Sequence, residues 1–148
     1  MPTNPIFQNR IQELVKENGS PKIELAKQIG IAHCTFSRAV NYGIIPKTKI
    51  LIRFADFFEV SVDYLLGKTD SITFYPTSNP STFYDRIEKL TQDKGFKSLS
   101  ALAQTAHLPR QYLFDWKKKN ILPTAELLEY LADYFDVSID FLLGRSDE

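Results

Sequence analysis

Apolar side chains recur at intervals of three and four residues along most of the chain, with polar side chains between them. This spacing places apolar side chains on one side of an α-helix, and no stretch shows the period of two that marks a half-buried strand. The sequence therefore predicts an all-α protein. In its first half, helices are expected over about residues 5–18, 21–29, 33–42, 47–58 and 62–66.

Capping residues set the expected helix ends. Asn4, Ser20 and Ser61 stand where an N-cap side chain accepts hydrogen bonds from the first free backbone N–H groups. Gly19 and Gly67 follow the last apolar positions of two helices, where a left-handed residue ends a helix at little steric cost. Equivalent residues occur in the second half of the chain.

The whole pattern occurs twice. The phrases FEVSVDYLLGKTD and FDVSIDFLLGRSD start at Phe58 and Phe135, 77 positions apart, and this register needs no gap from Ser20 onward. Self-similarity at a fixed spacing indicates a duplicated folding unit. We expect two tandem five-helix domains over residues 1–70 and 81–148. Residues 71–80, rich in Pro, Ser and Thr, are interpreted as a linker.

The two copies read LAKQIGIAHCTFSRAVN…P…ADFFEVSVDYLLG and LAQTAHLPRQYLFDWKKKNILPTAELLEYLADYFDVSIDFLLG. They resemble helix-turn-helix domains of the lambda-repressor-like (Cro-type, XRE) family, with the closing FxVSxDxLLG segment as the most specific part. The crossing of two helices needs a small residue, Ala26, and the turn favours a left-handed one, Gly30. His107 replaces this glycine in the second copy, at about 1 kcal/mol.

The resemblance implies a transcriptional regulator, and specifically a repressor, that binds double-stranded DNA. In this family the third helix enters the major groove, and a planar arginine fork such as Arg38 matches the two acceptors of guanine. Between Lys22 and Arg53 there are six basic residues and one acidic residue. Carried over to the first copy, the candidate DNA contacts are Lys22, His33, Cys34, Ser37, Arg38, Asn41, Lys47 and Lys49.

The second copy departs from this pattern. Leu99 stands at the position of Lys22, Phe114 and Tyr112 lie on the nominal reading helix, and Asp115 occupies the position of Arg38. The carboxylate repels the DNA backbone, although it can accept a hydrogen bond from cytosine. Dimerisation or a protein partner, as in an antitoxin, antirepressor or phage inhibitor, is therefore the alternative for this copy. Its candidate DNA contacts are Arg110, Gln111, Lys117 and Lys118.

The composition bears on how the protein binds DNA and on where it is located. Lys and Arg number 18, and so do Asp and Glu, so attraction to DNA must come from a local basic face rather than from net charge. The single cysteine excludes an internal disulfide. No apolar run approaches about 18 residues and the first residues lack a signal-peptide pattern, so we expect a cytoplasmic protein with no membrane contact.

No catalytic or metal site is expected. Two histidines and one cysteine have no metal-ligand spacing, and no nucleophile and base are suitably placed. Asp133, Asp136 and Asp140 are interpreted as a solvated face rather than a catalytic cluster. We expect no enzyme activity and no cofactor. The two copies and the linker occupy the whole chain, so no small-molecule effector is expected either.

Overall fold

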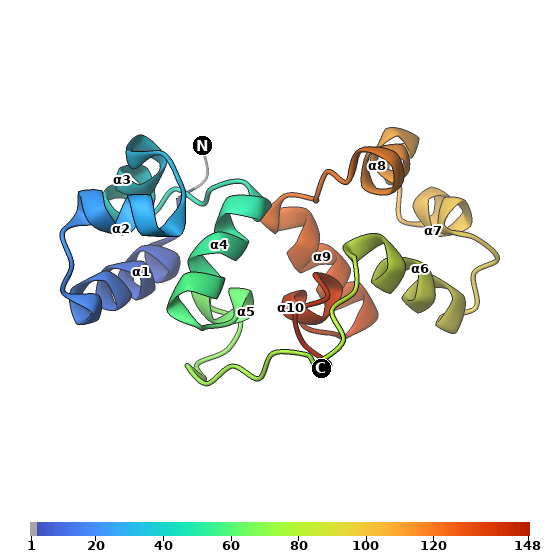
Figure 1. Ribbon diagram of the computed structural model, residues 1–148. Helices are drawn as coiled ribbons and strands as arrows, with labels where there is room; N and C mark the ends of the chain where they lie inside the picture. Colours follow the sequence, from blue (N-terminus) through green and yellow to red (C-terminus); the bar gives the residue numbers. More distant parts are fainter. Residues whose placement is uncertain (1–2) are drawn as a thin grey trace. The chain divides into compact units, whose positions relative to one another are not determined.

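The computed structural model describes residues 3–148, and the chain divides into two compact units, Met1–Phe74 and Tyr75–Glu148 (Figure 1). Within residues 3–148 there is no β-strand, and the extended pairing is a single antiparallel bridge between Thr3 and Ile44. The prediction of an all-α protein is therefore confirmed.

The described part of the first unit is helical. The Asn4 side chain accepts hydrogen bonds from the N–H groups of Ile6 and Phe7, and Gly19 ends the first helix with φ 79°. Ser61 likewise caps the last helix. The helices are α1 (Pro5–Asn18), α2 (Lys22–Ile29), α3 (His33–Tyr42), α4 (Thr48–Phe58) and α5 (Val62–Leu65).

The second unit has the same order of helices. Its third helix is continuous, but its last turn is a π-turn in which the Asn120 N–H donates to the Asp115 carbonyl. The bounds of α9 and α10 differ from those of α4 and α5 by the 77 positions of the sequence repeat. The helices are α6 (Phe83–Asp93), α7 (Leu99–Thr105), α8 (Arg110–Phe114), η1 (Asp115–Lys119), α9 (Ala125–Phe135) and α10 (Ile139–Leu142).

An arginine in the first helix of each unit binds the closing phrase. Arg10 donates through Nη1 to the carbonyl oxygen of Tyr64, and its guanidinium lies 4.2 Å from the centroid of the Tyr64 ring. Arg86 donates to the carbonyl oxygen of Phe141 at 3.1 Å and lies 4.4 Å from the centroid of that ring. Each of these carbonyl oxygens also accepts a backbone hydrogen bond, from the N–H of Gly67 or Gly144, so the arginine adds a second, charged donor. The repeated phrase thus closes each unit against its first helix.

Part of the segment expected to be a linker belongs to the second unit. The Thr77 N–H donates to the carbonyl oxygen of Arg145 at 2.8 Å. The Thr77 hydroxyl donates to the Asp147 carboxylate at 2.5 Å. Gly144 packs so closely on this segment that a Cβ there would lie 1.8 Å from the Ser81 carbonyl oxygen. The chain before α6 is therefore fixed against the C-terminal residues.

Two details of the sequence interpretation are wrong. The N-cap of α2 is Pro21 rather than Ser20, and no side chain caps that helix. Asp140 is not solvated: it is 2% exposed and accepts a hydrogen bond from Arg145, whereas Asp133 and Asp136 are exposed. The physical reason is that the turn after α10 folds back and brings the guanidinium over the carboxylate.

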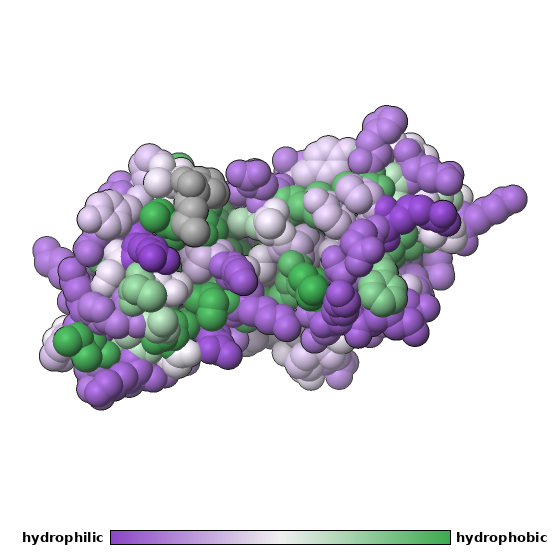
Figure 2. All heavy atoms as spheres, turned by 90° about the horizontal axis from the view of Figure 1, so that it is seen from above, coloured by the Kyte–Doolittle hydropathy of each residue, from purple (hydrophilic) through white to green (hydrophobic). Residues whose placement is uncertain are grey.

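The surface is mainly polar. Figure 2 shows hydrophilic side chains over most of the visible face, interrupted by separate apolar patches. The more exposed large apolar side chains include Ile23 at 61% and Tyr42 at 65%. Scattered apolar residues of this kind are normal on small domains. Among the helices of residues 3–148, none has the length and hydropathy needed to cross a bilayer.

Candidate nucleic-acid interface

The corner between α2 and α3 is fixed by its backbone. Gly30 has φ 84°, and the N–H groups of Gly30 and Ile31 both donate to the carbonyl oxygen of Ala26 at 3.0 Å. Ala26 is 2% exposed, as expected for the small residue where two helices cross. The Arg53 Nη1 donates to the Gly30 carbonyl at 2.6 Å, a contact that the sequence interpretation missed. Arg53 is therefore used within the fold.

The inner side of α3 is apolar. Phe36, Ala39 and Val40 are buried, and the Phe36 ring lies 6.0 Å from that of Phe54. Burial of this side leaves the opposite side of the helix in solvent. We call this outer side the reading face of the first unit: His33, Cys34, Ser37, Arg38 and Asn41. All are exposed except Ser37, which is half-buried.

Three lysines extend the basic surface beyond α3. Lys22 is the first residue of α2, Lys47 is the N-cap residue of α4, and Lys49 lies in the first turn of α4. All three side chains are exposed. The positive end of a helix dipole adds to the charge of these lysines, so both helix starts favour an anion. The geometry suits phosphate contact.

Two glutamines on α1 hold the last turn of α3. Gln8 donates through Nε2 to the carbonyl oxygen of Asn41 at 2.7 Å. Gln12 donates through Nε2 to the carbonyl oxygen of Val40 at 2.8 Å. Carbonyls at a helix end lack intrahelical partners, and these amides satisfy them. Both side chains lie in the groove between α1 and α3 and thereby close it.

The second unit makes the same corner with different residues. The Leu108 N–H donates to the Ala103 carbonyl at 2.8 Å, as Ile31 does to Ala26 in the first unit. His107 takes the left-handed conformation with φ 58°, as the sequence predicted. Tyr130 occupies the position of Arg53 in the repeat, so the guanidinium donor to this turn is missing from the sequence.

The outer side of α8 and η1 carries more cations than that of α3, but it also carries a carboxylate, Asp115, at the position of Arg38. Gln111 is exposed but donates through Nε2 to the Asp115 carboxylate at 3.0 Å. The Tyr112 ring lies 6.1 Å from that of the buried Trp116 on the same helix and is 40% exposed. Arg110 and Lys118 are exposed. Lys117 and Lys119 on the same helix are exposed as well.

Lys117 points elsewhere. It stands at the position of buried Val40 in the repeat, and its Nζ lies 5.9 Å from the centroid of the Tyr84 ring on α6. Lys118 follows Lys117 in the same π-turn, and both lysines lie beside the space between α6 and the α8–η1 helix.

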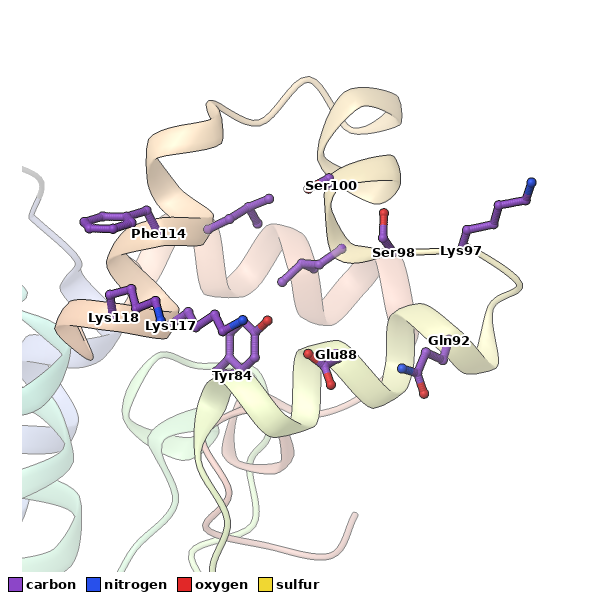
Figure 3. A pocket seen from close by; sticks show the side chains of 11 residues that line it. Tyr84, Glu88, Gln92, Lys97, Ser98, Ser100, Phe114, Lys117 and Lys118 are labelled. Carbon is purple, nitrogen blue, oxygen red and sulfur yellow. The ribbon is translucent and has the colours of Figure 1, made fainter.

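A pocket of about 430 Å³ lies beside Lys117, between α6, α7 and the α8–η1 helix (Figure 3). Tyr84 and Glu88 line it from α6, at the positions of Gln8 and Gln12 in the repeat. Leu99 and Leu113 supply its apolar lining. The groove that two glutamines close in the first unit is thus open in the second.

Tyr84 is perturbed by its place in this pocket. Burial is the main cause that raises the pKa of its phenol, and a hydrogen bond to Glu88 and the charge of that carboxylate raise the pKa further. The neutral phenol is therefore favoured. In the part of the chain that the structure describes, no cluster of three His, Cys, Asp or Glu residues could hold a metal ion.

Comparison with known proteins identifies the second unit. Residues 85–148 match the family described as the bacteriophage CI repressor helix-turn-helix domain. No curated protein and no solved structure matches the chain significantly. The matched segment runs from within α6 to the C-terminus. The match covers less than half of the chain and supports a CI-like helix-turn-helix domain in this unit.

Proposed function

We propose that the chain is a sequence-specific DNA-binding repressor of the Cro-type (XRE) kind with two tandem helix-turn-helix domains. The observation that carries the proposal is the exposed reading face of α3, which follows a left-handed glycine corner and presents Arg38 and Asn41. The family match to the second unit supports the same class of function for the repeated unit.

In the first unit, Arg38 reads base edges and the lysines at the helix starts bind phosphates. Arg38 is exposed, and its guanidinium can donate to both acceptors of guanine. His33, Cys34, Ser37 and Asn41 lie on the same side of α3 and complete the contact with bases or sugar. Lys22, Lys47 and Lys49 hold the unit on the duplex without reading its sequence.

In the second unit, Arg110, Gln111 and Lys118 are the proposed contacts, and they make a weaker reading head. Lys117, the fourth residue predicted from the sequence, is directed toward Tyr84 on α6 instead. Asp115 engages Gln111 and carries the negative charge that repels the backbone. This unit therefore adds avidity more than sequence discrimination. Tethering two heads raises the effective concentration of the second to about millimolar when the linker is short.

Selection of binding sites from random double-stranded DNA with the full chain tests the proposal. Two half-sites at fixed spacing are expected, with the stronger preference in one of them. Arg38→Ala should weaken binding by about 1–3 kcal/mol and relax one base position. Lys22→Ala should weaken binding to all sequences and reduce the salt dependence by about one phosphate.

Lys16→Ala is the matched control, because it removes one positive charge from the exposed end of α1 instead of the reading face. It should leave affinity and selected sequence unchanged. Unaltered binding in both Arg38→Ala and Lys22→Ala would contradict the proposal for the first unit. Selection of no DNA at all would contradict it for the whole chain.

Homodimerisation through the second unit is the second candidate function. Phe114, at the position of Ser37, is 48% exposed, more than the largely buried aromatics of the core. An exposed aromatic ring on an outward helix is typical of a protein contact. Sedimentation equilibrium decides this: a dimer lost in Phe114→Ala supports association, whereas a monomer at all concentrations excludes it.

A further inference from the structure

We propose that the pocket of the second unit binds an acidic segment of a partner protein, which inserts one apolar side chain and places carboxylates beside the lysines. This inference goes beyond the DNA contact and does not depend on it. The pocket of about 430 Å³ falls within the usual range of binding sites.

The apolar part of the pocket receives the inserted side chain. Leu99 replaces Lys22 of the first unit, and Leu113 replaces Phe36, which is fully buried there. The smaller Leu113 and the loss of the two glutamines leave space above these residues. An apolar anchor in a partly enclosed pocket is the usual centre of a peptide contact.

The charge of the rim selects an acidic partner. Lys97, Lys117 and Lys118 line the pocket together with a single carboxylate, that of Glu88. Figure 3 shows Lys117 and Lys118 on η1, across the pocket from Glu88 on α6. Glu88 is also the partner of the Tyr84 phenol, which takes up part of its accepting capacity. Complementary charge at the rim fixes orientation and speeds association.

The shape of the site favours a peptide over other occupants. Phe114 lines the pocket and is 48% exposed, so the apolar surface continues outside the cavity. A segment with one inserted side chain and neighbouring residues covers both parts, which a small molecule in the cavity does not. A DNA duplex offers negative charge but no aliphatic side chain for Leu99 and Leu113.

Selection from a library of random twelve-residue peptides, displayed on phage and captured by the immobilised full chain, tests the proposal. The enriched sequences should combine an apolar residue with Asp or Glu within one or two positions. Synthetic copies labelled with fluorescein are then titrated by fluorescence polarisation against the chain and its variants.

Three changes to the pocket separate its contributions. Lys117→Glu with Lys118→Glu reverses the rim charge and should weaken binding about tenfold or more. Tyr84→Gln with Glu88→Gln introduces the two glutamines of the first unit. This pair should close the groove and weaken peptide binding about tenfold or more, even though loss of the Glu88 charge by itself would favour an acidic peptide. Ser100→Trp places a ring at the exposed rim and should have the same effect.

Lys16→Glu with Lys89→Glu is the control of matched charge, because both lysines are exposed and neither lines the pocket. It should change affinity by less than about twofold. Circular dichroism melts verify that each variant is folded. Enrichment of no peptide or of basic peptides, or equal binding by all folded variants, would overturn the proposal. A self-associating chain whose dimer is lost in Lys117→Glu with Lys118→Glu would overturn it in favour of a second copy.

Discussion

The two units differ in the groove between their first and third helices, although most of their helix boundaries correspond. In the first unit, Gln8 and Gln12 donate across it to carbonyls at the end of α3. In the second unit, Tyr84 and Glu88 stand at these positions and line an open pocket. The apolar residues of the last helix correspond closely in the two units, whereas Leu113 and Trp116 replace Phe36 and Ala39 in the third helix.

This difference indicates that residues along a surface groove can change while the helices of a repeated fold keep their positions. From the second helix of each unit onward, corresponding helices start and end within one residue of equivalent positions, and Arg10 and Arg86 bind the closing phrase in both units. A few polar positions along one groove then change a sealed surface into a concave one. Substitutions in either unit test this comparison.

The largest effect is expected from the two arginines of the closing phrase. Arg10→Ala and Arg86→Ala should each lower the unfolding free energy of their own unit by roughly 3 kcal/mol, because buried carbonyls lose a charged donor. Native-state hydrogen exchange of α1 and α6 amides measures each unit separately. Lys16→Ala and Lys89→Ala, exposed residues on the same helices, serve as controls. Equal loss of protection in both units would show that they do not unfold independently.

Removal of the glutamines should open the groove of the first unit. Gln8→Ala with Gln12→Ala leaves the carbonyls of Val40 and Asn41 without these donors and should lower the unfolding free energy by about 2 kcal/mol. Amides in the last turn of α3 should exchange faster, with smaller changes in α2. Gln28→Ala on exposed α2 is the matched control, and an equal effect there would rule out the groove as the cause.

Substitution of the residue at the corner between the second and third helices should have a smaller effect on the unfolding free energy. His107→Gly should raise the unfolding free energy of the second unit by about 1 kcal/mol, since glycine adopts φ 58° without a Cβ penalty. Gly30→His should lower that of the first unit by a similar amount. A Cβ at Gly30 would meet only the Arg53 Nη1 at 3.9 Å, so the penalty is conformational. Thermal melts should show a higher Tm for His107→Gly and a lower Tm for Gly30→His. A shift of Tm in the same direction for both variants would contradict this account.

The smallest effect concerns the phenol of Tyr84. Glu88→Gln should lower its pKa, because the carboxylate is removed, but burial, the larger cause, should keep the pKa above the ordinary value. Absorbance titration of each protein minus its Tyr84→Phe counterpart isolates this group. The folded state holds the proton more tightly than the unfolded chain, so this contribution to stability is lost as pH rises above the ordinary tyrosine pKa. An unchanged pKa in Glu88→Gln would leave burial and the charge of Asp85 as the causes.

Features encoded by neighbouring residues could be predicted from the sequence. The Asn4 cap, the Gly19 stop and the bounds of α3 follow from local signals and agree with the structure. The outward position of Arg38 follows from the helical period, although its contact with DNA stays a prediction. The register of the repeat predicted which helices correspond.

Features that depend on contacts across the fold could not be predicted. Burial of Asp140 requires the turn after α10 to bring Arg145 over it. The use of Arg53 at the Gly30 carbonyl requires the packing of α4 against the corner. The pocket depends on how far Tyr84 reaches across the groove. The one available signal was the exchange of two glutamines for Tyr84 and Glu88 in the aligned copies.

The hydrogen bonds from Thr77 to Arg145 and Asp147 bring the entry and exit of the second unit together. Chain ends that meet in this way are suited to circular permutation and to insertion into a loop of another protein. A gene fragment that encodes this unit alone should begin before Thr77, not at α6. Joined ends also make head-to-tail duplication of such a module sterically simple.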